Sequence, residues 1–301
     1  MKEKVSIIIT NYNGRELLEK NIPHIIKAYK NKDNNIVEII VVDDASKDGS
    51  AEYLKSSFPE LSIIRHKINR GFPASVNTGA RMAKGKLLAL LNNDVTPSVD
   101  FLKSTVGLFD DSTLFAVSLH EKGYGYAIGK FENGYILHSP GSEVQDIHKT
   151  FWASGGSAVF RRSLWMKLGG FDDKLYNPFY WEDIDISYRA RKRGYRLLWN
   201  PKSSVIHEHE ATTGKIPKGK RTRIQERNQL LFIWKNLTSR FLFRKHIVGL
   251  GRRLVRHPGY LVIVLMAASR IRIVTKSRKK EKRESKVSDE AIFDEFANDN
   301  R

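Results

Sequence analysis

Mainly apolar runs and longer amphipathic segments alternate from residue 5 to about residue 118. The apolar runs predict buried strands at residues 5–10, 37–43, 63–65 and 87–91. Helical spacing of apolar residues predicts helices at residues 16–29, 51–58 and 74–83. Thr96 and Pro97 predict one more helix, with Thr96 as its N-cap and Pro97 at its first position. Strands that are apolar throughout are typical of a parallel sheet covered on both faces, so we expect an α/β fold.

The alternation weakens after about residue 118. Glycine and aromatic residues dominate residues 123–156, which indicates loops or irregular strands. Helical spacing returns at residues 162–168 and 184–193, and a strand is predicted at residues 195–199. Residues 218–250 have a basic helical pattern. Residues 258–268 are mostly apolar, but they are too few to span a bilayer, which takes about 20 residues.

The net charge of +19 is concentrated in one segment. Residues 215–286 contain 22 Lys and Arg against 3 Asp and Glu, whereas residues 1–214 contain 29 against 25. Residues 287–301 contain 1 against 5. We therefore expect an α/β domain at 1–214, a basic and mainly helical segment at 215–286, and an acidic disordered tail at 287–301. The basic segment indicates an anionic partner, either a lipid headgroup or a nucleic acid.

The apolar residues 258–268 lie between two strongly basic flanks. This arrangement suits a segment that lies on a membrane surface, and a pair of core helices with a solvated basic face fits it equally well. The chain has no cysteine, which excludes disulfides and thiolate metal sites and agrees with a reducing cytoplasm. Its first apolar run is too short for a signal peptide, so we expect no export.

Polar residues follow three of the predicted strands. Thr10 to Asn13 end the first strand, Asp43 and Asp44 end the second, and Asn92 to Asp94 follow the strand at 87–91. In parallel sheets, ligands bind at the carboxyl ends of the strands. Asp43 or Asp44 alone could simply cap the next helix, but three polar strand ends along one edge indicate a ligand site. The missing GxGxxG and GxxxxGK(S/T) motifs argue against a dinucleotide site or a P-loop.

Two later stretches also carry candidate chemistry. Glu182 and Asp183 follow three aromatic residues and open an Arg-rich helix, where a carboxylate could act as a general base on a hydroxyl. Acids at a helix start also occur without any catalytic role. His207 follows an apolar pair and could bind a metal or serve structure. His209 is a weaker candidate, because alternate residues of a strand face opposite ways.

Five motifs in order closely resemble a family 2, inverting glycosyltransferase with a GT-A fold. They are VSIIITNYNG, IIVVDDASKDGS, NRGFPASVNTGARMAKGKLLALLNNDV, FWASGGSAVFRRSLWMKLGGFDD and FYWEDIDISYRARKRGYRL, within roughly residues 4–210. The resemblance implies a nucleotide-diphosphate sugar donor, a divalent cation (Mn²⁺ or Mg²⁺) and single-displacement transfer to a hydroxyl. The Gln-any-any-Arg-Trp motif of processive members is missing, which favours transfer of one sugar over polymer synthesis.

The resemblance also implies roles for residues on the donor side. Thr10, Tyr12 and Asn13 would belong to the nucleotide pocket, and Asp44 would accept the N3–H of uracil or thymine. A UDP- or dTDP-sugar is therefore the expected donor. Asp44 does not distinguish uracil from thymine, and the N1–H of guanine could also satisfy it. The remaining donor-side residues implied are Asn69, Arg70 (near phosphate), Asn93 (ribose), Gly155 and Gly156 (the loop near the sugar).

The same resemblance assigns the metal and the acceptor side. Asp94, the one acid left in the Asn-Asn-Asp motif, and His207 would bind the metal. Asp183 would be the catalytic base, with Glu182 and Trp181 on the acceptor side. The expected acceptor is a lipid-linked or surface glycan. The expected location is cytoplasmic and peripheral, at the inner face of the plasma membrane, on an anionic membrane surface.

Three other functions fit parts of the sequence. A nucleotidyltransferase for sugar phosphates would carry a Gly-rich loop followed by Arg and Lys, which TNYNGREL matches poorly. A nucleic-acid-binding protein would use the basic segment, but Trp234, Phe241 and Phe243 have helical spacing and are predicted to be core, so no nucleic acid is expected. An inactive relative would explain the reduced metal motif, but Asp183 is intact.

Overall fold

The structure is a computed structural model that describes residues 3–208, 214 and 216–297. The strands are β1 (Val5–Asn11), β2 (Ile36–Asp43), β3 (Ser62–Arg65), β4 (Leu87–Asn92), β5 (Val95–Pro97), β6 (Leu114–Glu121), β7 (Ala127–Glu132), β8 (Tyr135–Pro140), β9 (His148–Lys149), β10 (Ser157–Arg161) and β11 (Arg196–His207). The α-helices are α1 (Arg15–Lys30), α2 (Ser50–Ser57), α3 (Phe72–Met82), α4 (Arg162–Leu168), α5 (Asp173–Tyr176), α6 (Glu182–Lys192), α7 (Lys218–Asn236), α8 (Arg240–Arg256), α9 (Leu261–Ala268), α10 (Ile271–Glu284) and α11 (Asp289–Asp294). Short 3-10 helices lie at Lys32–Asn34, Val106–Asp110 and Pro258–Tyr260.

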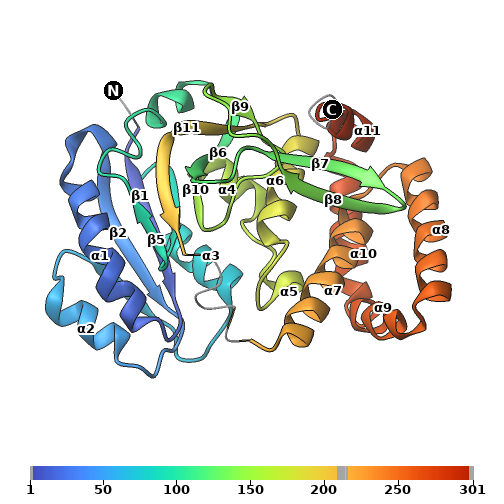
Figure 1. The fold of residues 1–301 in the computed structure, drawn as a ribbon, viewed down its shortest axis with the longest axis horizontal. Helices are drawn as coiled ribbons and strands as arrows, with labels where there is room; N and C mark the ends of the chain where they lie inside the picture. The colour runs from blue at the N-terminus through green and yellow to red at the C-terminus, as the bar shows by residue number, and fades with distance from the viewer. Residues whose placement is uncertain (1–2, 209–213, 215, 298–301) are drawn as a thin grey trace.

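The predicted α/β fold is confirmed. The central sheet has the strand order β3-β2-β1-β4-β10-β6-β11-β5, with β9 on β11. β1 pairs parallel with β2 and β4, β2 pairs parallel with β3, and β10 runs antiparallel between β4 and β6. A separate β7–β8 hairpin extends from the sheet toward the C-terminal helices (Figure 1).

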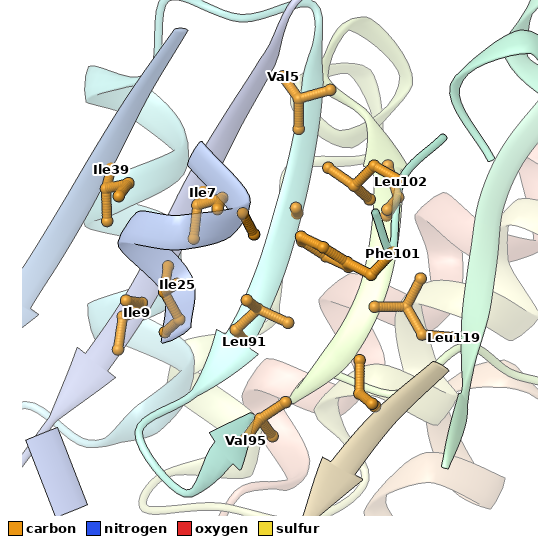
Figure 2. Close-up of a cluster of buried hydrophobic side chains, with 14 of the residues drawn as sticks. Val5, Ile7, Ile9, Ile25, Ile39, Leu91, Val95, Phe101, Leu102 and Leu119 are labelled. Carbon is orange, nitrogen blue, oxygen red and sulfur yellow. The ribbon is translucent and has the colours of Figure 1, made fainter. Parts of the chain in front are cut away.

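Helices cover both faces of the sheet because side chains alternate along each strand. Ile7 and Ile9 face one apolar layer, whereas Ile8 faces the other. Figure 2 shows the first layer, in which Ile25 of α1 and Phe101 pack with the strand residues. Helices α3, α4 and α6 supply the second layer. The elements predicted before residue 93 are confirmed to within two residues at each end.

The helix predicted at Thr96 and Pro97 is wrong. These residues form β5, which pairs antiparallel with β11. Thr96 lies opposite Ile206, and its hydroxyl donates to the carboxamide oxygen of Asn21. The capping signal was overridden because a distant strand supplied backbone partners for this segment.

The disordered tail predicted at 287–301 is also wrong within its described part. Residues Asp289–Asp294 form α11, and the Ser288 hydroxyl caps it. Asp289 is fully buried, where it bonds Lys192 Nζ and the Tyr188 hydroxyl, each at 2.7 Å. Phe296 is buried as well. Within the described part of this segment, acids therefore pair with cations of the α/β domain, Asp289 with Lys192 and Glu295 with Arg191.

The basic segment is helical, as predicted, and it is fused to the α/β domain. One apolar cluster includes Trp181 and Tyr188 of the domain together with Phe232 and Ile263 of the C-terminal helices. The boundary expected at residue 214 thus does not separate two cores. Among the described residues, no single helix is long and apolar enough to cross a membrane. The segments Pro258–Ala268 and Ile271–Glu284 pass that test only as a pair, with a 70° bend between them.

Candidate active site

The carboxyl ends of β1, β2 and β4 lie side by side. The register places Asn11 opposite Asp43 and Thr10 opposite Asn92. The residues at these ends open into a cavity of about 790 Å³, which is also lined by residues of the loop before α6 and the start of α7. The cavity lies at the sheet edge that the polar strand ends predicted.

Most of the predicted site residues line this cavity. They are Thr10, Tyr12, Asp44, Asn69, Asn93, Asp94, Gly155, Gly156, Glu182, Asp183 and His207. Asn13, Arg70 and Trp181 are not among the described residues that line it. Asn13 instead accepts a hydrogen bond from the Lys47 amide, and the Arg70 side chain is exposed. Trp181 packs against Phe232, with ring centroids 5.1 Å apart.

The two acids that end β2 have different roles. Asp43 accepts hydrogen bonds from the Ser46 amide and the Asn11 carboxamide, both at 3.1 Å, so it supports the turn as predicted. Neither acid caps the next helix, because α2 has Gly49 at its N-cap position and no side-chain cap. The simple capping interpretation of Asp43 and Asp44 is therefore wrong.

Asp44 is buried and held by three nitrogen groups. His66 Nδ1 lies 2.7 Å from its Oδ1, and the backbone N–H groups of Arg70 and Gly71 donate to the carboxylate at 2.9 and 2.8 Å. His66 Nε2 lies 3.1 Å from the Thr78 hydroxyl, which fixes the ring. Sequence reasoning missed His66, since nothing in its local pattern links it to Asp44. An ionised carboxylate only accepts hydrogen bonds, so Asp44 presents an acceptor to the cavity.

Asp94 and His207 are brought together by the pairing of β5 with β11. His207 lies opposite Val95, and its Nε2 is 3.1 Å from Asp94 Oδ1. Its Nδ1 is 3.1 Å from Glu121 Oε1, a contact that the sequence did not predict. Burial disfavours the imidazolium, but the two carboxylates outweigh burial and raise the pKa of His207 to about 9.

The Asp94–His207 pair fits a divalent cation. Asp94 Oδ1 is buried, and His207 Nε2 approaches it to 3.1 Å without meeting the geometry of a hydrogen bond. A carboxylate oxygen and a neutral imidazole nitrogen are suitable ligands for Mn²⁺. A cation bound here would have to displace the proton that His207, with its pKa of about 9, keeps at neutral pH. No group of three or more ligating side chains occurs among the described residues. His209 lies outside the described residues.

The loop at Ser154–Gly156 contacts both the end of β4 and the start of α6. A Cβ at Gly156 would lie 2.3 Å from the Asn92 side chain, so only glycine fits against the end of β4. The Gly155 amide donates to Asp183 Oδ2 at 3.1 Å, and the Ile184 amide donates to Asp183 Oδ1 at 2.8 Å. These two bonds orient the Asp183 carboxylate in the cavity wall.

Burial and neighbouring charges together give different pKa values to the three acids in the first turn of α6, which are Glu182, Asp183 and Asp185. Burial raises the pKa of Asp183 to about 6, in the range that suits a general base near neutral pH. Burial and the neighbouring Asp183 raise the pKa of Glu182 well above its ordinary value, so Glu182 is neutral and able to donate a hydrogen bond. Asp185 is also buried, but Lys235 and Arg189 outweigh burial and lower its pKa.

The turn before Asp183 is held by α7. Tyr180 and Trp181 have φ values of 74° and 75°, a conformation that costs a non-glycine residue about 1–3 kcal/mol. The side chain of Asn228, which is fully buried, donates to the carbonyl oxygens of Phe179 and Tyr180 at 2.9 and 2.8 Å. Arg227 donates to the Asn228 carboxamide oxygen, which fixes the direction of that amide.

Helix α7 also forms part of the cavity wall. Lys220 and Ile224, four residues apart on one face of the helix, line the cavity, and Ile216 lines it just before the helix begins. Lys220 is the one Lys or Arg among the described lining residues, which also include the acids Asp94 and Asp183. Sequence reasoning placed α7 in a separate segment and did not assign any of these residues to the site.

The strand order, the strand-end cavity and the paired acids define a GT-A glycosyltransferase. The chain belongs to glycosyl transferase family 2, whose sequence profile matches residues 6–169. A second profile, glycosyl transferase family group 2, matches residues 133–275 and so reaches into the C-terminal helices. The predicted family and enzyme class are confirmed, which argues against the nucleotidyltransferase and nucleic-acid-binding alternatives.

Several curated relatives are glycosyltransferases. The N-acetylglucosaminyl-diphospho-decaprenol L-rhamnosyltransferase of Mycobacterium tuberculosis is 35% identical over 251 residues, which cover 72% of this chain and 80% of that protein. The probable glycosyltransferase YdaM of Bacillus subtilis is 27% identical over 276 residues, which cover 82% of this chain. The chain spans 61% of the length of YdaM and 38% of a Mycobacterium tuberculosis pre-mycofactocin glycosyltransferase.

Solved structures support the fold. GalNAc-T7, solved with UDP, GalNAc and Mn²⁺, has a TM-score of 0.65 and 20% identity, and the match covers 79% of this chain and 49% of that chain. The mannosyltransferase PcManGT from Pyrobaculum calidifontis, solved with GDP-Man and Mn²⁺, has a TM-score of 0.56 and 18% identity. That match covers 94% of this chain and 85% of the other. Both neighbours have nucleotide-sugar components and Mn²⁺ in their structures.

Proposed function

We propose that this protein transfers one sugar, with inversion, from a UDP- or dTDP-sugar to a hydroxyl of a lipid-linked or surface-glycan acceptor. The observation that carries the proposal is the position of Asp183. Its carboxyl, with a pKa of about 6, lines the same cavity as the acceptor-only Asp44 and the Asp94–His207 pair. A base, a nucleotide reader and a metal pair in one cavity are the parts that a single displacement needs.

Donor binding is proposed at the ends of β1, β2 and β4. Asp44 would accept the N3–H of uracil or thymine, and Tyr12, which is 43% exposed, would stack on the base. Thr10 and Asn69 line this part of the cavity, and Asn93 would contact the ribose. The Arg70 side chain would have to turn inward to reach a phosphate. Lys220 already lines the cavity, so it is the better candidate for that contact.

The proposed chemistry follows from the two neighbouring acids. Asp183 takes the proton of the acceptor hydroxyl as the oxygen attacks the anomeric carbon, and the bond from that carbon to the diphosphate breaks. Glu182, held neutral, donates a hydrogen bond to the acceptor. Asp94 and His207 would hold Mn²⁺ or Mg²⁺, which when bound neutralises charge on the leaving diphosphate.

A lipid-linked acceptor is supported by the name of the 35% identical relative, a diphospho-decaprenol rhamnosyltransferase. We propose that the protein acts peripherally at the cytoplasmic face of the plasma membrane, where such an acceptor is embedded. Trp181, predicted on the acceptor side, would act indirectly, because it is buried against Phe232 and does not line the cavity.

The test is a thermal-shift panel of UDP, dTDP, GDP, CDP and ADP, each with and without Mn²⁺. A ligand at about 100 times its dissociation constant stabilises a protein by roughly 2.7 kcal/mol. Metal-dependent stabilisation by UDP or dTDP is expected, and Asp44→Asn should abolish it. Stabilisation by ADP or CDP alone, or none by any nucleotide, would overturn the donor assignment.

A further inference from the structure

The outer surface of α8 combines apolar and basic side chains that no other element covers in the described structure. Phe241, Val248 and Val255 are 60%, 53% and 82% exposed. They are seven residues apart, so they form one row along the helix. Arg244 and Arg252 are exposed between them. The prediction that Phe241 belongs to the core is therefore wrong.

Helix α9, joined to α8 through the 3-10 helix Pro258–Tyr260, also exposes apolar side chains. Its sequence, LVIVLMAA, contains no polar residue, yet Leu261, Val262 and Leu265 are 50%, 50% and 60% exposed. The opposite side, with Ile263 and Ala267, is buried against the rest of the protein. A helix that is apolar all round is normally buried, so the exposed half of α9 lacks an expected partner. Figure 1 places α8 and α9 at the end of the molecule opposite α1 and α2.

The charge around this surface has one sign. Residues 227–280 contain 14 Lys and Arg and no Asp or Glu. The two acids that flank this stretch are already paired, Glu226 with Arg253 of α8 and Glu281 with Arg193 of the α/β domain. The exposed cations beside the apolar row, such as Arg252 and Arg256, therefore face solvent without a neighbouring acid in this stretch.

We propose that the outer face of α8 and α9 docks in the plane of an anionic lipid bilayer. The apolar side chains enter the interface and the basic side chains contact lipid phosphates, as in other helices that lie on membranes. A nucleic acid would match the charge, but it offers no hydrocarbon to cover Val255 and Leu265. A second copy of the chain would bring the same positive charge, which disfavours pairing of the two faces.

The biological role of this docking rests on the proposed function, because docking would keep the active site near a lipid-linked acceptor. α7 begins at the cavity wall and packs against α9 and α10. Its 19 residues span roughly 28 Å at about 1.5 Å per residue. The bilayer face and the site that holds Asp183 are thus parts of one packed unit, and an acceptor could stay anchored while its sugar reaches the cavity.

The experiment is vesicle flotation of the full-length protein on phosphatidylcholine alone and on phosphatidylcholine mixed with phosphatidylglycerol. Binding is expected only to the mixed vesicles. Leu261→Asp with Leu265→Asp should weaken it at least tenfold. Arg252→Gln with Arg256→Gln should weaken it about 30-fold, at roughly a factor of five for each basic side chain. The matched controls, Met82→Asp and Lys27→Gln with Lys55→Gln, change exposed residues at the other end and should bind as wild type.

Each contrary result would overturn the docking face. These results are no binding to the mixed vesicles, equal binding to both vesicles, wild-type binding by the two test variants, or equal losses in the controls. Removal of the protein from vesicles by a DNA duplex at physiological salt would instead indicate a nucleic-acid surface. Stabilisation by UDP or dTDP with Mn²⁺, measured on the same variants, should be unchanged, so failure of the docking face is distinguished from failure of the proposed function.

Discussion

The side-chain amide of Asn228 donates a 2.8 Å hydrogen bond to the carbonyl oxygen of Tyr180, three residues before Asp183. It also binds the preceding carbonyl, of Phe179. Because Tyr180 and Trp181 both have positive φ, the turn needs outside support to keep this shape. On the other side of Asp183, Lys235 and Asn236 of the same helix bind Asp185. Helix α7 therefore holds the segment that carries the candidate base at both ends.

We expect Asn228→Asp to lower kcat roughly 10²-fold, because a carboxylate would repel the two carbonyls and displace the base by an ångström or so. The KM for the donor and donor stabilisation by UDP or dTDP with Mn²⁺ should stay close to wild type. The matched control is Gln225→Glu, the same chemical change at an exposed position of α7. A fall in melting temperature with unchanged kcat would mean that Asn228 serves only folding.

Asp183→Asn should lower the rate of sugar transfer at least 10²-fold, whereas nucleotide binding should be unchanged. In the wild type, the base works only when deprotonated, and burial raises the pKa of Asp183 to about 6. The value of kcat/KM should therefore fall as the pH drops through about 6, and it should be constant at pH values well above 6. A profile of kcat/KM between pH 5 and pH 8 tests this sign, and a flat acid limb would contradict the assignment of Asp183.

Asp94→Ala should remove the Mn²⁺-dependent part of nucleotide stabilisation, because it deletes the carboxylate ligand beside His207. The metal-independent part of binding, through Asp44, should remain. Asp100→Ala, which removes an exposed carboxylate near β5, is the control. If Mn²⁺ still increases the thermal shift of Asp94→Ala as much as that of wild type, Asp94 is not a metal ligand.

Asp289→Ala should destabilise the protein by about 3–5 kcal/mol, because it leaves the buried Lys192 ammonium without its carboxylate partner. Asp294→Ala, an exposed acid at the end of α11, should change the free energy of unfolding by less than about 0.5 kcal/mol. Urea denaturation of both variants measures the difference. Equal stabilities would mean that α11 does not contribute to the fold as the buried contacts indicate.

The packing of the C-terminal helices against the α/β domain determines which variants can test membrane binding. Deletion of residues 215–301 would remove Phe232 and Asn228 together with the basic surface, so it would expose the core and release the turn before Asp183. Substitutions of exposed residues on α8 and α9 test the same surface without that damage, because their side chains make few contacts within the protein.

Local pattern alone determined much of this protein. The apolar runs predicted the strands of the first half, and the polar residues after them predicted the edge where Asp44 and Asp94 meet in one cavity. This worked because the carboxyl ends of parallel strands must share one edge of the sheet, whatever the rest of the chain does. The motif order likewise identified the family, although the roles of the individual residues remain predictions.

Only the tertiary structure decided the rest. His66 beside Asp44, Glu121 beside His207 and Asn228 beneath Tyr180 are contacts between segments that are distant in sequence, and no local spacing specifies them. Thr96 lies in a strand because β11 supplies backbone hydrogen-bond partners that outweigh the local helix signal. Asp289 is buried because Lys192 supplies an ion-pair partner that the acidic composition of the tail did not predict. Local sequence sets what a segment can form, whereas packing decides which partners it meets, and the packing of α7 made the C-terminal helices part of the candidate active site.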